Sequence, residues 1–545
     1  MKHFLYSLVL LLLLVSCGNN NSINTKKMNL AMLATDLEIL AADDMEGRAP
    51  CTAGGERAVR YLQSRMEEIG LEPAFGESYL QEVPLVKILP DPSEPVVVKD
   101  KKGVLQYTNG AEISLWSPML SPEISLTNNE IVFVGFGIDA PEHNWNDFEK
   151  IDVKGKTIMV LVNDPGFFTQ DSTLFNGTTM TYYGRWTYKF EEAERKGAAG
   201  CIIVHEDVAA GYPWAVPSRH SRDPEYYLQD EAQSEKQCKV LGWISQSAAR
   251  DLLARSGYDY DALKEAAVTR DFTPIQLQAK FNVRLRNSWE TCTSHNVAGV
   301  LRGSTAPDEA VVYVAHWDHL GIGRPVDGDS IYNGASDNAA AMAWVLAIAE
   351  EFKVQPQTER SLLFFIPTAE ESSLLGSYHY VENPVFPMEK TVAGFNSDVI
   401  LMLGRFEDVT VTGLGHSELD QYLEKEALKQ GRYISNDPNP ENGMFFRSDQ
   451  LPFMKKGVPF LFAKGYTHQR ELGKEATLQI IADYWKNVYH KPCDEFVSER
   501  DKLDGLFEDA QLFFSVGYRI ANEKTYPQWH KTSEFYQERC VDRVL

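Results

Sequence analysis

The sequence predicts an α/β protein whose main domain has three αβα layers, with a largely parallel central sheet between helices. Three observations predict this class. Near-continuous apolar runs of strand length occupy residues 311–315, 361–366 and 392–403. An alanine-rich helical stretch at 339–352 and a shorter one at 374–381 separate these runs. Strands that are apolar throughout and alternate with helices are typical of a parallel sheet covered on both faces.

A second domain is expected because the chain of 545 residues is too long for one ordinary hydrophobic core. We predict that the main domain consists of residues 28–120 and 279–545, and that a smaller domain at 121–278 is inserted between them. The formal net charge of -24 disfavours nucleic acid and anionic membrane surfaces as partners. The net charge does not indicate an oligomeric state.

The N-terminus has the pattern of an export signal. Lys2 and His3 precede an apolar run at 4–15, which is too short to span a membrane as a helix. The string Leu14-Val15-Ser16-Cys17 resembles the lipobox of bacterial lipoproteins, in which the cysteine is lipidated and becomes the new N-terminus. A plain signal peptide with an incidental cysteine is the alternative. We expect a signal at 1–17, a polar tether at 18–27 and an exported protein, anchored by lipid at Cys17 to the periplasmic or outer face of the bacterial envelope.

The first segment of the main domain begins with an amphipathic helix at 30–40 and a second helix at 56–69. The loop between them, D-D-M-E-G-R-A-P-C-T-A-G-G, is long for a simple connector, so it is a candidate for lining a site. In the inserted segment, expected strands at 131–137, 156–162 and 201–204 alternate with helical residues such as 191–196. This alternation predicts a small self-contained α/β or β-rich module.

Acidic and histidine residues occur where the apolar runs of the main domain give way to loops. They are His316, Asp337, the doublet Glu370-Glu371, Asp398 and His490. A mixture of imidazole and carboxylate suits zinc or a similar transition metal better than calcium or magnesium. The doublet offers one carboxylate to bind metal and another to transfer protons, as metal-assisted hydrolysis requires. Ligands of parallel sheets bind beyond the carboxyl ends of the strands, where these residues are expected.

Each position also has a plain structural alternative. His316 could be a satisfied core histidine, Asp337 the N-cap of the alanine-rich helix, and the glutamate doublet a solvated loop. Asp398 resists such an explanation, because a carboxylate inside the expected strand at 392–403 is costly unless it is paired or bound to metal. His468 is an alternative to His490 as the last metal-binding histidine. Asp318 is two residues from His316 and could fix the orientation of its imidazole.

Taken in order, these motifs resemble the co-catalytic zinc aminopeptidases, metallopeptidase family twenty-eight, in the branch with an inserted protease-associated domain. The resemblance runs through D-D-M-E-G-R-A-P-C-T-A-G-G-E-R-A, A-H-W-D-H, N-G-A-S-D-N-A-A-A, A-E-E-S-S-L-L-G-S, N-S-D-V-I, R-S-D-Q-L-P-F-M-K-K-G-V-P and Y-H-K-P-C-D-E-F. The strings V-G-F-G-I, D-V-K-G-K-T-I-M-V-L and E-R-K-G-A-A-G-C-I-I-V resemble a protease-associated domain, with an unrelated insertion as the alternative.

The resemblance implies two zinc ions per chain and the removal of N-terminal residues from peptides. Asp337 would bridge the metals, and Glu370 would be the general base. His316 and Asp398 would complete one metal site, while Glu371 and His490 would complete the other. Asp318 would be the partner of His316, and the peptide bond between Asp337 and Asn338 would be cis. Ser336 and Ser373 depart from the residues common in the family, and the interval at 467–488 is extended.

Two other functions remain open. A carboxypeptidase of the glutamate-carboxypeptidase type would need a basic pocket, to which Arg447 could contribute, although a surface charge is the simpler interpretation of that residue. A metal-free protein resembling the transferrin receptor is disfavoured, because all five expected ligand positions keep ligating side chains. The six cysteines other than Cys17 can form disulfides in an oxidising compartment, but their spacing does not decide the pairing.

Overall fold

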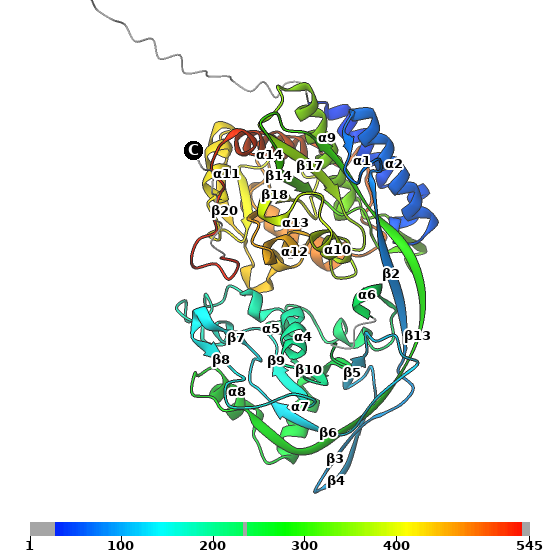
Figure 1. The fold of residues 1–545 in the computed structure, drawn as a ribbon, viewed down its shortest axis with the longest axis vertical. Coiled ribbons are helices and arrows are strands. Elements are labelled where there is room, and N and C mark those ends of the chain that lie inside the picture. Colours follow the sequence, from blue (N-terminus) through cyan, green and yellow to red (C-terminus); the bar gives the residue numbers. More distant parts are fainter. Residues whose placement is uncertain (1–27, 233–236, 537–545) are drawn as a thin grey trace, which may run out of the picture.

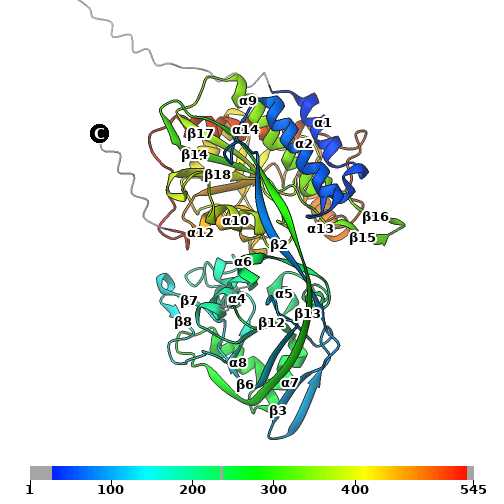
Figure 2. The ribbon, with the colours of Figure 1, turned by 45° about the vertical axis from the view of Figure 1, so that its right-hand side comes forward.

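The computed structural model describes residues 28–232 and 237–536, so the expected signal, lipobox and tether lie outside the described residues. The chain forms two lobes stacked along the long axis (Figures 1 and 2). Two antiparallel strands, β2 (Leu80–Asp91) and β13 (Ile275–Leu301), run from one lobe into the other. This ribbon connects the lobes through continuous main-chain hydrogen bonding.

The sheet of the upper lobe has a parallel centre. Its four central strands, in spatial order, are β17 (Arg360–Ile366), β14 (Ala306–Val314), β18 (Thr391–Asn396) and β21 (Phe460–Lys464). Antiparallel strands flank this centre: β13 with β1 (Glu72–Pro73) beside β17, and β19 (Asp408–Thr412) beside β21, with β20 (Tyr433–Asn436) parallel to β19. The predicted α/β class with a mostly parallel central sheet is confirmed.

Alternate residues of the central strands enter two different cores. Val311 and Tyr313 of β14 pack in the core that contains α9 (Ala340–Val354), α14 (Asp504–Asn522), α1 (Leu30–Leu40) and α2 (Ala53–Ile69). Val312 and Val314 face the other core, with α10 (Leu375–Glu382) and α12 (Gln450–Lys455). Helix α11 (Leu419–Lys429) lies beside α14. Burial on both faces explains why these strands are apolar throughout.

The lower lobe has its own smaller sheet. Its parallel strands are β6 (Glu123–Phe133), β9 (Thr157–Leu161), β10 (Gly200–His205) and β12 (Val240–Ser245), with β5 (Ile113–Trp116) antiparallel to β12 and β13 antiparallel to β6. A hairpin of β3 (Val96–Asp100) and β4 (Gly103–Tyr107) extends from β13. The longer helices of this lobe are α4 (Trp186–Arg195), α7 (Gln246–Arg255) and α8 (Tyr260–Ala267).

The lower lobe begins earlier in the chain than the predicted insertion. Residues 96–116 were expected in the first main-domain segment at 28–120. In the structure β3 and β5 pair with β13 and β12, and these pairings hold them in the lower lobe. The assignment of this lobe as a protease-associated domain stays a prediction.

Shorter elements complete the two lobes. In the lower lobe these are α3 (Pro165–Thr169), α5 (Asp207–Ala210), α6 (Gln229–Ala232) and the pair β7 (Asp139–Ala140) and β8 (Trp145–Asn146). Strand β11 (Glu225–Leu228) pairs with β2, and β15 (Gly321–Val326) with β16 (Asp329–Tyr332). A disulfide joins Cys51 to Cys292 on β13. Across 28–232 and 237–536, every helix is too short or too polar to cross a membrane.

Candidate active site

The expected site residues meet at the carboxyl edge of the central sheet. His316 lies just after β14, Glu370 after β17 and Asp398 after β18. Because these neighbouring strands are parallel, their following loops leave the sheet at the same edge. The position of Asp398 differs from the prediction, which placed it inside a strand at 392–403. Strand β18 ends at Asn396, and the positive φ of 51° at Val399 turns the chain away from strand geometry.

Two groups of potential metal ligands share Asp337. One group is His316, Asp337 and Asp398, and the other is His319, Asp337, Glu371 and His490; within each group the ligand atoms all lie within 4.8 Å of one another. His316 Nε2 is 3.5 Å from Asp337 and 3.3 Å from Asp398. His490 Nε2 is 3.3 Å from Asp337 and 3.0 Å from Glu371. The structure therefore brings together all five side chains that were expected to bind metal.

His490, and not His468, joins these groups. The His468 imidazole contacts the hydroxyl of Tyr433 at 2.9 Å. The extended interval at 467–488 contains the whole of helix α13 (Gly473–Asn487), which ends shortly before His490. The ring of Tyr489 stacks on the His490 ring at a centroid distance of 3.8 Å. The extra helix thus leads into the site rather than displacing its last histidine.

His319 is a member of the site that the sequence analysis missed. Its Nδ1 lies 2.7 Å from Glu371, and its ring is buried. Its Nε2 has no hydrogen-bond partner within the described part of the chain. The available signal was the second histidine of H-W-D-H, three residues after His316. A buried imidazole with one free ring nitrogen, beside a carboxylate, fits either a ligand or a group that orients Glu371.

The chemistry of the two groups fits zinc. Their donors are imidazole nitrogens and carboxylate oxygens, which are the usual zinc ligands besides cysteine. Burial by itself would lower the pKa of His490, but the carboxylates of Glu371 and Asp337 raise it to about 10. A cluster of buried carboxylates that holds a proton on a histidine this strongly attracts positive charge. A divalent cation would satisfy the same carboxylates.

Asp318 has a different role from the one expected. His316 Nδ1 is 3.0 Å from the main-chain oxygen of Asp318 and 3.9 Å from its carboxylate. The carboxylate instead accepts the main-chain N–H groups of Glu370 at 3.0 Å and Glu371 at 3.3 Å. Asp318 therefore fixes His316 through its backbone and the glutamate doublet through its side chain. Both interactions orient potential ligands from behind.

Asp494 supports Asp337 in the same way. Its carboxylate accepts the main-chain N–H groups of Ser336 at 3.0 Å and Asp337 at 3.1 Å. The peptide bond from Asp337 to Asn338 is cis, as the resemblance implied. Asp494 lies four residues after His490 in Y-H-K-P-C-D. This one segment therefore supplies a potential metal ligand, His490, and the carboxylate that holds a second potential ligand, Asp337, in place.

Arg48 ties the loop D-D-M-E-G-R to the back of the site. Its buried guanidinium donates to four main-chain oxygens, those of Leu40, Trp317, Asn333 and Gly334, at 2.5 to 2.9 Å. Trp317 follows His316, and Gly334 lies on the loop that leads to Asp337. Burial lowers the pKa of Arg48 to about 10, although the carboxylates of Asp337 and Asp494 oppose this shift. We expected this loop to line a site. Arg48 instead holds the backbone around the site in place from a position outside the cleft.

Replacing Arg48 by methionine is expected to destabilise the protein by about 3 to 5 kcal/mol, because several buried carbonyl groups lose their donor. Urea denaturation measured side by side with the wild type checks this value. Arg60→Met on α2 is the matched control: Arg60 is exposed, so its removal should change the free energy of unfolding by less than about 0.5 kcal/mol. Equal stability of the two variants would contradict the bracing role.

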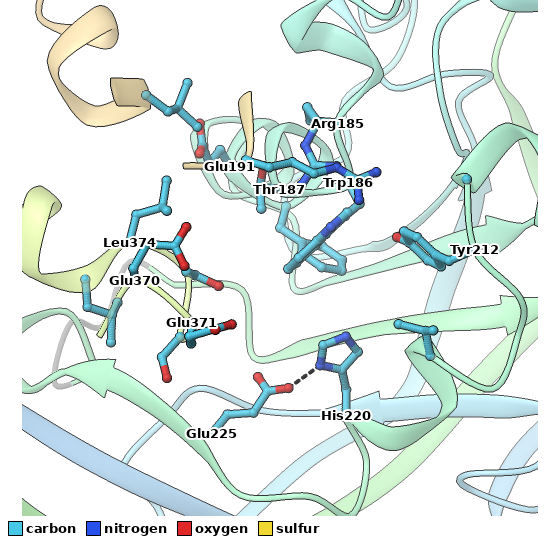
Figure 3. Close-up of a pocket in the computed structure, with 18 of the residues that line it drawn as sticks. Arg185, Trp186, Thr187, Glu191, Tyr212, His220, Glu225, Glu370, Glu371 and Leu374 are labelled. Atoms are coloured by element: carbon cyan, nitrogen blue, oxygen red, sulfur yellow. Dashed lines mark hydrogen bonds and ion pairs between the residues drawn. The ribbon is translucent and has the colours of Figure 1, made fainter. Parts of the chain in front are cut away.

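The potential metal ligands open into a cleft between the lobes. Its volume is about 2050 Å³, enough for a peptide. Asp337, Glu370, Glu371, Asp398 and His490 line its upper wall. Figure 3 shows Glu370 and Glu371 on one side of the cleft, with lower-lobe residues opposite, namely Arg185, Trp186, Tyr212, His220 and Glu225. Arg447 also lines the cleft, and its guanidinium lies 5.8 Å from the ring of Tyr212 in the lower lobe, so the interpretation as a surface charge was wrong.

Comparison with known proteins gives four findings. Residues 296–513 match Peptidase family M28. A mouse protein, Aminopeptidase NAALADL1 of Mus musculus, is 31% identical over 127 residues, which are 22% of this chain and only 16% of the mouse protein. The solved aminopeptidase from Aneurinibacillus sp. strain AM-1 has a TM-score of 0.50 and 16% identity, covering 92% of this chain and 96% of its own. At this identity the likeness shows a shared fold. A zinc aminopeptidase from Bacillus subtilis has a TM-score of 0.42 and 18% identity, covering 94% and 98% respectively.

Proposed function

We propose that this protein is a zinc-dependent aminopeptidase that removes N-terminal residues from peptides, because residues 296–513 match Peptidase family M28. The observation that carries the proposal is the pair of ligand groups that share Asp337 at the wall of a peptide-sized cleft. The name of the mouse relative supports the aminopeptidase type.

Two zinc ions per chain are proposed, with Asp337 shared between them. His316 and Asp398 would hold one ion, and Glu371 and His490 the other. His319 would orient Glu371 through the contact at 2.7 Å. Bound zinc would supply Lewis acidity, which lowers the pKa of a water and polarises a peptide carbonyl.

Glu370 is the proposed general base. It faces the cleft beside Glu371, and its carboxylate lies 3.8 Å from His316 Nε2. Glu370 takes a proton from the attacking water and returns it to the amine that leaves. Asp318 holds the main chain of the doublet, which keeps the two carboxylates in separate positions for separate tasks.

The cellular setting is proposed from the sequence. The protein is exported and held at the bacterial cell envelope by lipid at Cys17. Its partners are peptide substrates, and the charge of -24 disfavours nucleic acid. The lower lobe, proposed as a protease-associated domain, forms one wall of the cleft and restricts which peptides enter.

A panel of matched peptides with free or acetylated amino termini tests the function. Release of the first residue from free peptides only is expected, with activity lost on chelation and restored by zinc. Cleavage of the acetylated peptides from their carboxyl end would favour a carboxypeptidase instead. A protein that binds no zinc and hydrolyses none of them would favour a receptor or binding role.

A further inference from the structure

Two arginines enter the cleft from opposite lobes. Arg185 directly precedes α4 of the lower lobe, and Arg447 follows the short helical turn Met444–Phe446 of the upper lobe. Within residues 28–232 and 237–536, neither guanidinium forms an ion pair, and Nε of Arg185 and both Nε and Nη2 of Arg447 are buried without a hydrogen-bond partner. Arg185 is only 7% exposed. Buried charges of this kind are costly unless something compensates them.

The two guanidinium groups are close enough to repel each other. Burial lowers the pKa of Arg185 to about 9, and the charge of Arg447 is the next largest cause. Phenols are the next largest electrostatic influences on Arg185; Tyr212 affects both arginines, and its ring lies 5.8 Å from the Arg447 guanidinium. Two adjacent cations walled by neutral aromatic rings form a place where a single anion would be stabilised by both.

The arginine pair is linked to the proposed metal groups through short stretches of chain. Ser448, the next residue after Arg447, hydrogen-bonds Asn396 at 2.8 Å and also interacts with Asp398. Tyr489 interacts electrostatically with Arg447, and the ring of Tyr489 stacks on the ring of His490. The arginines and the potential metal ligands line one continuous cleft. A molecule held at the arginines would therefore extend toward the reacting centre.

We propose that Arg185 and Arg447 together form a carboxylate-binding subsite for the peptide substrate, with one arginine supplied by each lobe. This inference rests on the proposed peptidase function, because a carboxylate is the anion that a peptide carries. Guanidinium groups bind carboxylates through paired hydrogen bonds, which a lysine at the same place would not reproduce. The preferred substrates are then short peptides with a free C-terminus, or peptides with an acidic side chain at a matching position.

The test compares tripeptides that share the same first residue. One has a free C-terminal carboxylate, one a C-terminal amide, and two are amides with aspartate at the second or third position. The free acid or one aspartate amide is expected to have a kcat/KM about 10- to 100-fold above the plain amide, as the loss of a charged hydrogen bond predicts. Which of them is preferred identifies the source of the carboxylate.

Arg185→Met and Arg447→Met are expected to remove this preference, because each should lower kcat/KM for the acidic peptide more than for the plain amide, mainly through a higher KM. Arg219→Met is the control, because Arg219 lines the same cleft but is exposed and paired with Asp223 at 2.7 Å. It should keep the preference. Equal kcat/KM for all four peptides in the wild type, or equal losses for acid and amide in the variants, would overturn the subsite.

Calorimetric binding of the same peptides in the presence of a chelator separates this inference from the proposed function. The acidic peptide should bind the wild type about 10-fold more tightly than the plain amide, and both arginine variants should lose that difference. A protein that hydrolyses no peptide but shows this difference would overturn the aminopeptidase proposal and leave the subsite standing. Equal binding of acid and amide would reject the subsite whatever the activity.

Discussion

Glu370→Gln is expected to keep its zinc and to lose turnover by about two to four orders of magnitude. Glutamine has nearly the same shape as glutamate, and the main-chain bond from residue 370 to Asp318 does not involve the side chain. The amide cannot accept a proton from water, however. The measurement is kcat on an unblocked peptide, together with zinc per chain by atomic absorption on the same sample.

Two further variants make this result specific. Glu371→Gln alters a proposed ligand, so it should lose zinc as well as activity. Glu424→Gln changes an exposed glutamate on α11 and should behave as the wild type. Near-wild-type turnover in zinc-loaded Glu370→Gln would reject the assignment of the base. A loss of zinc from that variant would instead make Glu370 a ligand.

The positions of the central site residues were predictable because they depend on local pattern and one topological rule. Each apolar run ends at a recognisable place, and parallel strands bring their carboxyl ends to one edge. His316 and Glu370 follow from this rule. The strand predicted at 392–403 was too long, because apolar residues continue in the sequence beyond the end of the actual strand. Ile400 and Met402 are buried in the core beside α9 rather than in the sheet.

The supporting residues were not predictable, because their partners are remote in the sequence. Arg48 binds a carbonyl 285 residues away, and Asp494 binds the N–H of Asp337 from 157 residues away. Nothing near either residue indicates these contacts. Arg447 was misjudged for the same reason: a charged residue is exposed by default, and only the placement of the lower lobe over it creates a buried wall.

The predicted boundary between residues 278 and 279 falls inside β13, because this one strand serves both sheets. Strand β13 has 27 residues, far beyond the roughly 3 to 10 residues of ordinary strands. Its early part pairs with β3 and β6 of the lower lobe, and its late part pairs with β17 of the upper lobe. A sequence pattern that assumes ordinary strand lengths divides such an element at the wrong place.

Asp337→Ala is expected to weaken binding at both proposed zinc positions, because Asp337 is the residue common to the two ligand groups within the described chain. Asp398→Ala and His490→Ala each remove a ligand from one group and should leave the other ion bound. Loss of an outer-shell partner typically reduces metal affinity about 10- to 100-fold, so loss of a shared ligand should exceed this for each ion. Zinc titration against a competing chelator measures both affinities.

The comparison of stoichiometries makes the prediction decisive. The Asp337 variant should bind less than one zinc per chain at concentrations where Asp398→Ala and His490→Ala each bind about one, because metal affinity follows the number of remaining ligands. Circular dichroism of each variant checks that the fold is kept. If Asp337→Ala retained one tightly bound ion, the two groups would be independent sites, and the shared carboxylate would not couple them.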